Sequence, residues 1–107
     1  MSDMTYVKLE DLEDASDLLA ALAHPIRLRI VAGLLDGGCC VGPMTECLQL
    51  PQPLVSRHLG ILRDAGVVTV QPEGRNRRYE VIHPKAAALV AALLGDVEAP
   101  FVVAEAG

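Results

Sequence analysis

Two groups of side chains in this sequence have the types and spacing for chemistry, and the first lies in residues 52–63. Gln52, Ser56 and Arg57 lie on the side of a predicted helix that its leucines do not use. Arg63 extends the same polar side. Amide, hydroxyl and guanidinium groups form hydrogen bonds with base edges and with phosphates. The segment therefore indicates contact with a nucleic acid.

The second group consists of three cysteines, Cys39, Cys40 and Cys47. Cys39 and Cys40 are neighbours near the predicted start of a helix, a position that lowers the pKa of a thiol and favours the thiolate. Cys47 follows Cys40 by seven residues, close to two helical turns, so the two can share a face. Thiolates bind soft ions such as As(III), Zn, Cd or Cu(I), and they also react with oxidants and persulfides. The alternative for each cysteine is an ordinary core or half-buried residue.

Composition limits the class of protein to a small domain. With 107 residues, 51% of them hydrophobic and only 3% aromatic, the chain predicts one domain with a small core of Leu, Val, Ile and Ala. A core of this size is often completed by oligomerisation. No apolar run approaches the roughly 18 residues of a membrane span, and the acidic first residues lack a signal-peptide core. We therefore expect a cytoplasmic protein without a membrane partner, and an odd number of cysteines does not suit a secreted disulfide framework.

The charge of the chain is unevenly distributed. The formal net charge of −5 argues against nucleic-acid binding, but residues 51–85 hold six basic and three acidic residues, a local net charge of +3. Residues 1–20 hold six acidic residues against Lys8 alone. Because local rather than total charge governs attraction to phosphates, the middle of the chain remains suited to nucleic acid.

Hydrophobic spacing predicts four helices, a β-hairpin and a final helix, which is a mainly α fold with a β-hairpin wing. The terminal helices carry apolar stripes that a monomer leaves uncovered, so we expect them to pair in a two-fold homodimer. The expected organisation is an arm (1–8), a winged helix-turn-helix domain (9–94) and a flexible tail (95–107). The helices are predicted at 9–23, 25–35, 43–48, 53–64 and 84–94, and the strands at 67–71 and 77–82, around a turn at 72–76.

With these elements in place, the chain resembles the ArsR/SmtB family of bacterial winged-helix repressors. The similarity covers roughly residues 10–94 and is carried by four stretches. It implies a homodimeric repressor that binds operator DNA and releases it when an effector is sensed. The stretches are Leu-Ala-His-Pro-Ile-Arg-Leu-Arg-Ile (22–30), Gln-Pro-Leu-Val-Ser-Arg-His-Leu (52–59), Leu-Arg-Asp-Ala-Gly-Val-Val (62–68) and Glu-Gly-Arg-Asn-Arg-Arg-Tyr (73–79).

The resemblance also assigns DNA-contacting positions. Two alternatives stay open for His58, which is either structural or phosphate-bound at the helix edge, or reads a base. Since neighbours on a helix do not face each other, we expect no pairing of Arg63 with Asp64. His24 is expected to be a helix cap or core residue. The recognition-helix positions are Gln52, Pro53, Ser56, Arg57 and His58, and the wing positions are Arg75, Arg77 and Arg78.

The family's metal site on the helix before the turn is broken in this chain. Cys40 matches the first cysteine of the family's Cys-x-Cys pair, but Gly42 stands in place of the second and Pro43 in place of the acidic residue. Thr45 stands where some arsenic-sensing members have another cysteine. Near the family's other metal site, between the terminal helices, only His83 is present, so no site is expected there.

The best hypothesis for the effector is arsenite or another soft metal ion bound by Cys39, Cys40 and Cys47, and no other cofactor is expected. A reactive-sulfur or oxidant sensor that uses the same cysteines is the alternative. A winged-helix protein-interaction module is the competitor from another functional class. An enzyme is not expected, because the sequence has no Cys-x-x-Cys, Gly-rich phosphate loop or Ser/His/Asp arrangement.

Overall fold

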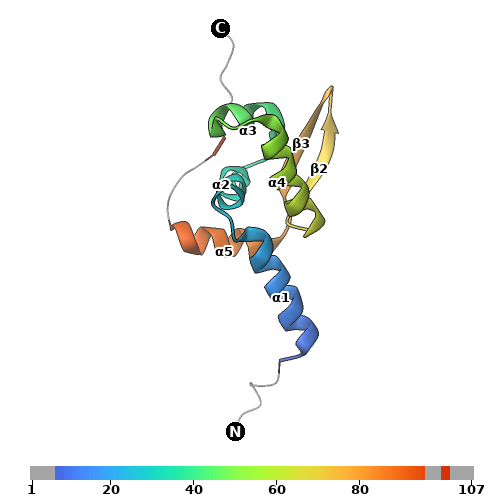
Figure 1. Ribbon diagram of the computed structural model, residues 1–107, viewed down its shortest axis with the longest axis vertical. Coiled ribbons are helices and arrows are strands. Elements are labelled where there is room, and N and C mark those ends of the chain that lie inside the picture. Colours follow the sequence, from blue (N-terminus) through green and yellow to red (C-terminus); the bar gives the residue numbers. More distant parts are fainter. Residues whose placement is uncertain (1–6, 96–99, 102–107) are drawn as a thin grey trace.

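The computed structural model describes residues 7–95, 100 and 101. In this part of the chain, helices surround a central helix and a twisted hairpin stands at one side (Figure 1). The predicted class, mainly α with a β-hairpin wing, is confirmed, and the structure adds one short strand. In chain order the elements are α1 (Leu9–Leu22), α2 (Pro25–Leu34), β1 (Cys39–Cys40), α3 (Val41–Leu48), α4 (Gln52–Asp64), β2 (Val68–Glu73), β3 (Asn76–Val81) and α5 (Pro84–Leu94).

Helix α2 forms the centre of the core. Ile30 and Val31 are fully buried and Leu34 is nearly so, and α3, α4 and α5 lie around the helix (Figure 1). Its N-terminus is capped by His24, whose Nδ1 accepts the backbone N–H of Ile26 at 3.1 Å. The expectation of a cap at this histidine is confirmed. None of the helices described is long and apolar enough to cross a membrane.

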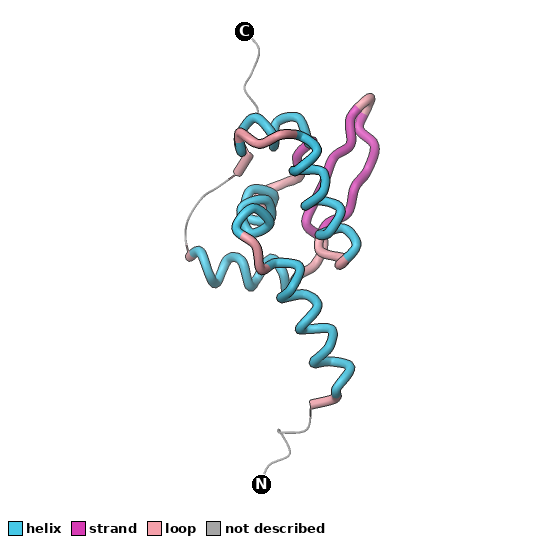
Figure 2. Tube along the Cα trace, viewed as in Figure 1, coloured by secondary structure: helices cyan, strands magenta, loops and turns pink. Residues whose placement is uncertain are grey.

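Helices α3 and α4 form the helix-turn-helix, and the chain turns sharply in the loop that connects them (Figure 2). Gln49 allows this turn by adopting a left-handed conformation with φ of 56°. The start predicted for the first helix at residue 43 is wrong by two residues, because Val41 and Gly42 already lie in α3 and Pro43 fits within its first turn. Gly66 follows the end of α4 with a positive φ of 76°, as is common for glycine after a helix.

The sheet has the strand order β1-β3-β2, with both pairs antiparallel. Cys39 and Cys40 form the unpredicted strand β1, opposite Tyr79 and Arg78. The predicted turn at 72–76 is too long, because Pro72 belongs to β2 and Glu73 pairs with Asn76. A proline is tolerated there because β2 is an edge strand.

The terminal segments differ in what they contact. Helix α1 projects away from the body of the molecule (Figure 1), with Leu9 and Leu12 more than half exposed. Most of the predicted arm (1–8) lies outside the described residues, and so does most of the predicted tail (95–107). Within that tail the described Phe101 is 9% exposed, its N–H bonds to the carbonyl of Gly33 at 3.3 Å, and its ring lies 4.7 Å from the Arg29 guanidinium. Phe101 therefore docks on α2.

Candidate nucleic-acid interface

Helix α4 divides into a buried and an exposed side, as its amphipathic spacing predicts. Its buried side chains are Val55, His58, Leu59 and Leu62. The opposite side exposes Gln52, Pro53, Ser56 and Arg57. Gln52, Ser56 and Arg63 follow one another by four and seven residues, so they line one flank, and Arg57 stands nearer the outermost ridge. The exposed side combines hydrogen-bonding groups with guanidinium charge.

His58 is not part of this exposed surface. Only 6% of the residue is exposed, and its Nδ1 lies 3.2 Å from Arg27 Nη1 on α2. Its ring contacts that of His24 at a centroid distance of 4.5 Å. Placing His58 among the base-reading residues is therefore wrong for this structure, because the histidine occupies the interface between α4 and α2. These contacts fit the alternative in which His58 has a structural role at the edge of the helix.

Arg63 and Asp64 do form an ion pair, contrary to expectation. Arg63 Nη2 lies 3.7 Å from Asp64 Oδ1. Asp64 is the last residue of α4. Both side chains are about half or more exposed, so solvent screens the pair and it contributes little to stability.

The hairpin presents its arginines in three directions. Arg75 lies in the two-residue turn after Gly74, whose φ of 61° is left-handed. Arg77 and Arg78 are consecutive in β3, and consecutive strand residues point to opposite faces of a sheet. The three arginines therefore do not form one patch. They could reach different phosphates along one nucleic-acid backbone.

The three cysteines fall into different environments. Cys39 is buried on the core face of the sheet, Cys40 is half-buried on the outer face, and Cys47 is exposed on α3. Burial raises the pKa of the Cys39 thiol, and the nearby Cys47 raises it further. Burial also raises the pKa of Cys40, followed by the hydrogen bond and negative charge of Glu73. The expectation that both thiols favour the thiolate is wrong, because burial raises the pKa of both and the Glu73 carboxylate raises that of Cys40 further.

Cys40 is connected to the hairpin through Glu73. Its Sγ donates to Glu73 Oε2 at 3.4 Å, and Arg78 Nη1 lies 3.8 Å from the same oxygen. The sheet register explains the cluster, because Arg78 is paired with both Cys40 and Gln71, so all four side chains share the outer face. Among residues 7–95, 100 and 101, no three His, Cys, Asp or Glu side chains are grouped so as to hold a metal ion.

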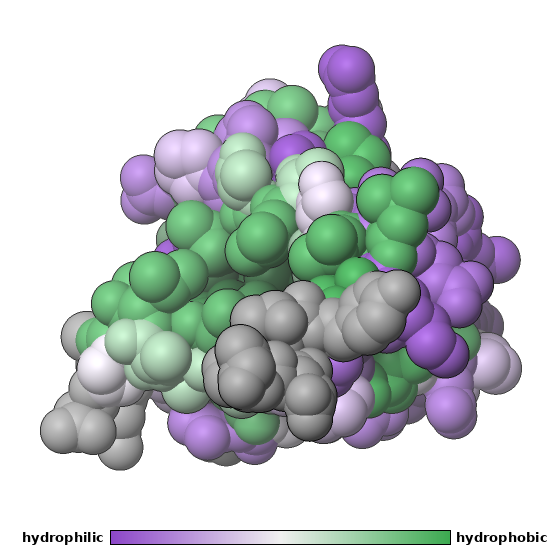
Figure 3. Space-filling view, turned by 90° about the horizontal axis from the view of Figure 1, so that it is seen from below, coloured by the Kyte–Doolittle hydropathy of each residue, from purple (hydrophilic) through white to green (hydrophobic). Residues whose placement is uncertain are grey.

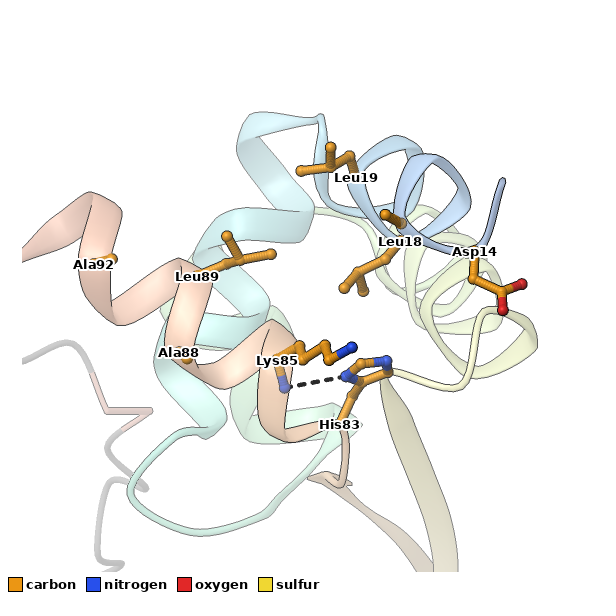
Figure 4. Close-up of a pocket in the computed structure, with 9 residues that line it drawn as sticks. Asp14, Leu18, Leu19, His83, Lys85, Ala88, Leu89 and Ala92 are labelled. Atoms are coloured by element: carbon orange, nitrogen blue, oxygen red, sulfur yellow. Dashed lines mark hydrogen bonds between the residues drawn. The ribbon is translucent and has the colours of Figure 1, made fainter. Parts of the chain in front are cut away.

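A second surface of interest is an apolar groove between α1 and α5, with a volume of about 590 Å³. Apolar side chains gather on this face of the molecule (Figure 3). Leu18 and Leu19 of α1 and Leu89 of α5 point into the same space (Figure 4). At the start of α5, His83 Nδ1 accepts the backbone N–H of Lys85 at 3.2 Å and so caps the helix. None of the residues that line the groove belongs to α4.

The sequence does not predict the contacts of two residues in this region, Arg27 and Glu73. Arg27 is a charged residue among the apolar residues of α2, and that position alone hints at a buried contact. Glu73 meets Cys40 across 33 positions of the chain, and only the strand pairing reveals this. The predicted contacts Gln52, Pro53, Ser56 and Arg57 do lie together on one exposed helix side.

Comparison with known proteins agrees with this geometry. The model of the family described as "Bacterial regulatory protein, arsR family" matches residues 24–70, which include α2, α3 and α4. The "HTH-type transcriptional repressor SmtB" of Mycobacterium tuberculosis is 47% identical over 72 residues, or 67% of this chain and 53% of that protein. The chain thus spans about half the length of this relative.

Two further proteins are similar over most of their length. The "Biofilm growth-associated repressor" of Xylella fastidiosa is 36% identical over 88 residues, which cover 78% of this chain and 77% of that protein. The solved structure of HlyU from Vibrio cholerae superposes with a TM-score of 0.77 at 31% identity, covering 80% of this chain and 94% of that one.

Proposed function

The chain belongs to the ArsR/SmtB family of bacterial winged-helix regulators, and from this premise we propose that it is a repressor that binds operator DNA as a homodimer. The resemblance seen in the sequence is thereby confirmed. The relatives are transcriptional regulators, which agrees with the expectation that the chain is not an enzyme. We expect this protein to bind its operator DNA in the cytoplasm.

The observation that carries this proposal is the exposed side of α4, which we call the recognition face and define as Gln52, Pro53, Ser56 and Arg57. A polar helix side of this kind fits the major groove, where amide and guanidinium groups distinguish bases. The arginines of the hairpin stand beside it and suit the phosphates on either side. The local positive charge supplies the attraction that the acidic chain as a whole lacks.

The direct test is hydroxyl-radical footprinting of the folded protein on the DNA upstream of its own gene. We expect two protected regions about one helical turn, or roughly 10 base pairs, apart, because a dimer presents two recognition faces. Absence of protection at moderate salt, with the protein folded and dimeric, would contradict the proposal. That result would favour the alternative of a winged-helix module that binds another protein.

The groove between α1 and α5 supports the dimer. It is lined mainly by leucine and alanine side chains of the two terminal helices, and Leu19 among them is 55% exposed. Apolar area of this kind is stabilised by burial against a like surface. A two-fold axis would place each groove against its copy and separate the two recognition faces.

Sedimentation measurements test the dimer. Leu19→Glu places a charge in the groove and should yield a folded monomer. Gln71→Glu adds the same charge on the exposed hairpin, far from the groove, and should leave the dimer intact. A dimer that survives Leu19→Glu would mean that another surface holds the two copies together.

We further propose that a thiol-reactive effector releases the DNA through Cys40. The Cys40 thiol donates to Glu73, which also pairs with Arg78 of the hairpin. When an effector replaces the thiol proton or modifies the sulfur, Glu73 loses this donor and is left to pair with Arg78. A proposed phosphate contact is then neutralised, and affinity for DNA falls.

Arsenite or another soft metal ion is the first effector class to test, and reactive sulfur or an oxidant is the alternative. Cys39, Cys40 and Cys47 differ in burial, and among the described residues no three potential metal ligands are grouped together, so reaction at one thiol is favoured over capture by three. DNA binding is titrated with arsenite, Cd(II), Zn(II) and a persulfide donor. Cys40→Ser should abolish the response, and Cys47→Ser should preserve it. A Cys40→Ser protein that responds to each agent like the wild type would exclude the Cys40 switch.

A further inference from the structure

A second basic site lies beside the recognition face, on the flank of α4 that meets α2. It is a hollow of about 290 Å³ lined by His24, Arg27, Leu54, Arg57, His58 and Ile61. Four of these six residues carry nitrogen donors or positive charge, and none is acidic. The hollow joins the N-terminus of α2 to the middle of α4.

The hydrogen bonds around the hollow leave two imidazole donors unused. An arginine only donates, so His58 Nδ1 must accept from Arg27 Nη1 at 3.2 Å, and the proton of the neutral ring sits on Nε2. His24 Nδ1 likewise accepts from the Ile26 N–H, which leaves its own proton on Nε2. Neither Nε2 has a hydrogen-bond partner in the part of the chain that the structure describes. For His58, which is only 6% exposed, such an unsatisfied donor is costly.

The charges around the hollow also lack a counter-ion. Arg57 forms no ion pair with any described residue. Arg27 donates through Nε and Nη2 to the carbonyls of Ala21 and Ala20 at the end of α1, and together with the contact to His58 these bonds use three of its five N–H groups. Two acids of α1 and α4, Asp17 and Asp64, line a separate hollow that shares Ile61 with this one. Two guanidiniums and two imidazole donors thus converge where no carboxylate stands.

We propose that this hollow binds a phosphate group, held by the guanidiniums of Arg27 and Arg57 and by the Nε2–H groups of His24 and His58. Arginine matches phosphate oxygens with paired donors, and the imidazole N–H groups add two more. The phosphate has two possible sources, the DNA backbone or a free anion. The DNA source rests on the proposed function, whereas the site itself does not.

A backbone phosphate in this hollow would anchor α2 as well as α4 to DNA. Because Arg27 also bonds to the last turn of α1, one phosphate would touch a junction of three helices. Such a contact fixes the rotation and depth of the recognition face in the groove without reading any base.

The first arm of the test uses inorganic phosphate and the full chain without DNA. NMR of the imidazole nitrogens follows a phosphate titration at constant ionic strength near neutral pH. We expect saturable shifts of His24 and His58. A bound anion should also raise the pKa of His58, because it offsets the charges of His24, Arg27 and Arg57 that face this ring. A purely structural role for these residues would give no such phosphate-linked change.

Variants make the first arm specific. Arg57→Gln is exposed and should fold normally while binding phosphate at least several-fold more weakly, and Arg27→Gln should lose the shifts. Arg75→Gln removes the same charge from the hairpin turn and should titrate like the wild type. If the imidazole signals of the wild type do not respond to phosphate, the proposal for a free anion is overturned. It is also overturned if the signals of Arg57→Gln respond as strongly as those of the wild type.

The second arm uses a short duplex from the DNA upstream of the gene, in which one backbone phosphate at a time is replaced by a neutral methylphosphonate. If a backbone phosphate enters the hollow, one replacement should weaken the wild type but not Arg27→Gln. Phosphate binding without this coupling assigns the site to a free anion. A duplex that is not bound at all contradicts the proposed function but leaves the first arm valid. Failure of both arms overturns the site.

Discussion

Arg27 Nη1 lies 3.2 Å from His58 Nδ1 and so joins the central helix α2 to helix α4. The same guanidinium donates through Nε to the carbonyl of Ala21, in the last turn of α1, at 2.6 Å. One side chain therefore ties the helix that carries the recognition face to a helix that lines the proposed dimer groove. Because these contacts sit at a helix junction, Arg27 and His58 set the position of α4.

The first prediction concerns pH. Burial lowers the pKa of His58 below its ordinary value, and the charges of His24, Arg27 and Arg57 lower it further. The unfolded chain then binds this proton more readily, so the contribution of His58 to stability is complete above about pH 6.5 and is lost as the pH falls. Urea unfolding should show stability falling from neutrality towards about pH 5.5, by no more than about 1.4 kcal/mol per pH unit from this group. His58→Gln should flatten that slope, and an unchanged slope would contradict the assignment.

The second prediction concerns the hairpin. Arg77 and Arg78 point to opposite faces of β3, so they should contact different phosphates. Each single Ala variant should lower the slope of log affinity against log salt by about 0.9, and the double variant by about twice that amount. Lys8→Ala removes one positive charge far from the hairpin and serves as the control. A double variant with the slope of either single variant would mean that only one arginine contacts DNA.

The third prediction concerns the reactivity of Cys40. Its raised pKa slows its reaction below alkaline pH, and the Glu73 carboxylate is one cause of that raised pKa. Glu73→Gln should therefore speed alkylation of Cys40, by less than about tenfold because burial remains. Peptide mass spectrometry after timed iodoacetamide treatment measures the rate. Glu80→Gln neutralises a carboxylate on the same sheet face, and an equal acceleration there would contradict the specific role of Glu73.

The fourth prediction concerns the docked Phe101. A Cβ built on Gly33 overlaps the ring of Phe101, so Gly33→Ala should displace the ring and destabilise the wild-type chain. With Phe101→Ala the space is free, and Gly33→Ala should then be neutral or stabilise by up to about 1 kcal/mol, because alanine favours a helix over glycine. A thermal double-mutant cycle measures this reversal. Gly33→Ala with the same effect in both backgrounds would show that the two residues do not interact.

The sequence predicts the helices and the recognition face well because both depend on local spacing. The amphipathic repeat in 53–64 places Ser56 and Arg57 outside, and the His-Pro pairs at 24–25 and 83–84 mark helix starts, each capped by its histidine. Gly66 and Gly74 end elements through positive φ angles.

Features that depend on pairing between distant segments could not be predicted. Strand β1 exists only because the edge of β3 is available to Cys39 and Cys40. Burial in the folded chain then raises the pKa of both thiols, where the sequence predicts a lowered one. The burial of His58 depends likewise on Arg27, 31 positions away. The docking of Phe101 depends on the missing side chain at Gly33 rather than on any local pattern.

The central claim, that the exposed side of α4 binds DNA, is tested most directly by the affinity of Arg57→Ala for the DNA upstream of the gene. Fluorescence anisotropy should show a loss of about tenfold or more, the cost of one guanidinium contact, with the dimer unchanged in sedimentation. Lys8→Ala, which removes the same charge from the distant end of α1, should bind nearly as the wild type. Equal affinities for Arg57→Ala and Lys8→Ala would contradict the account.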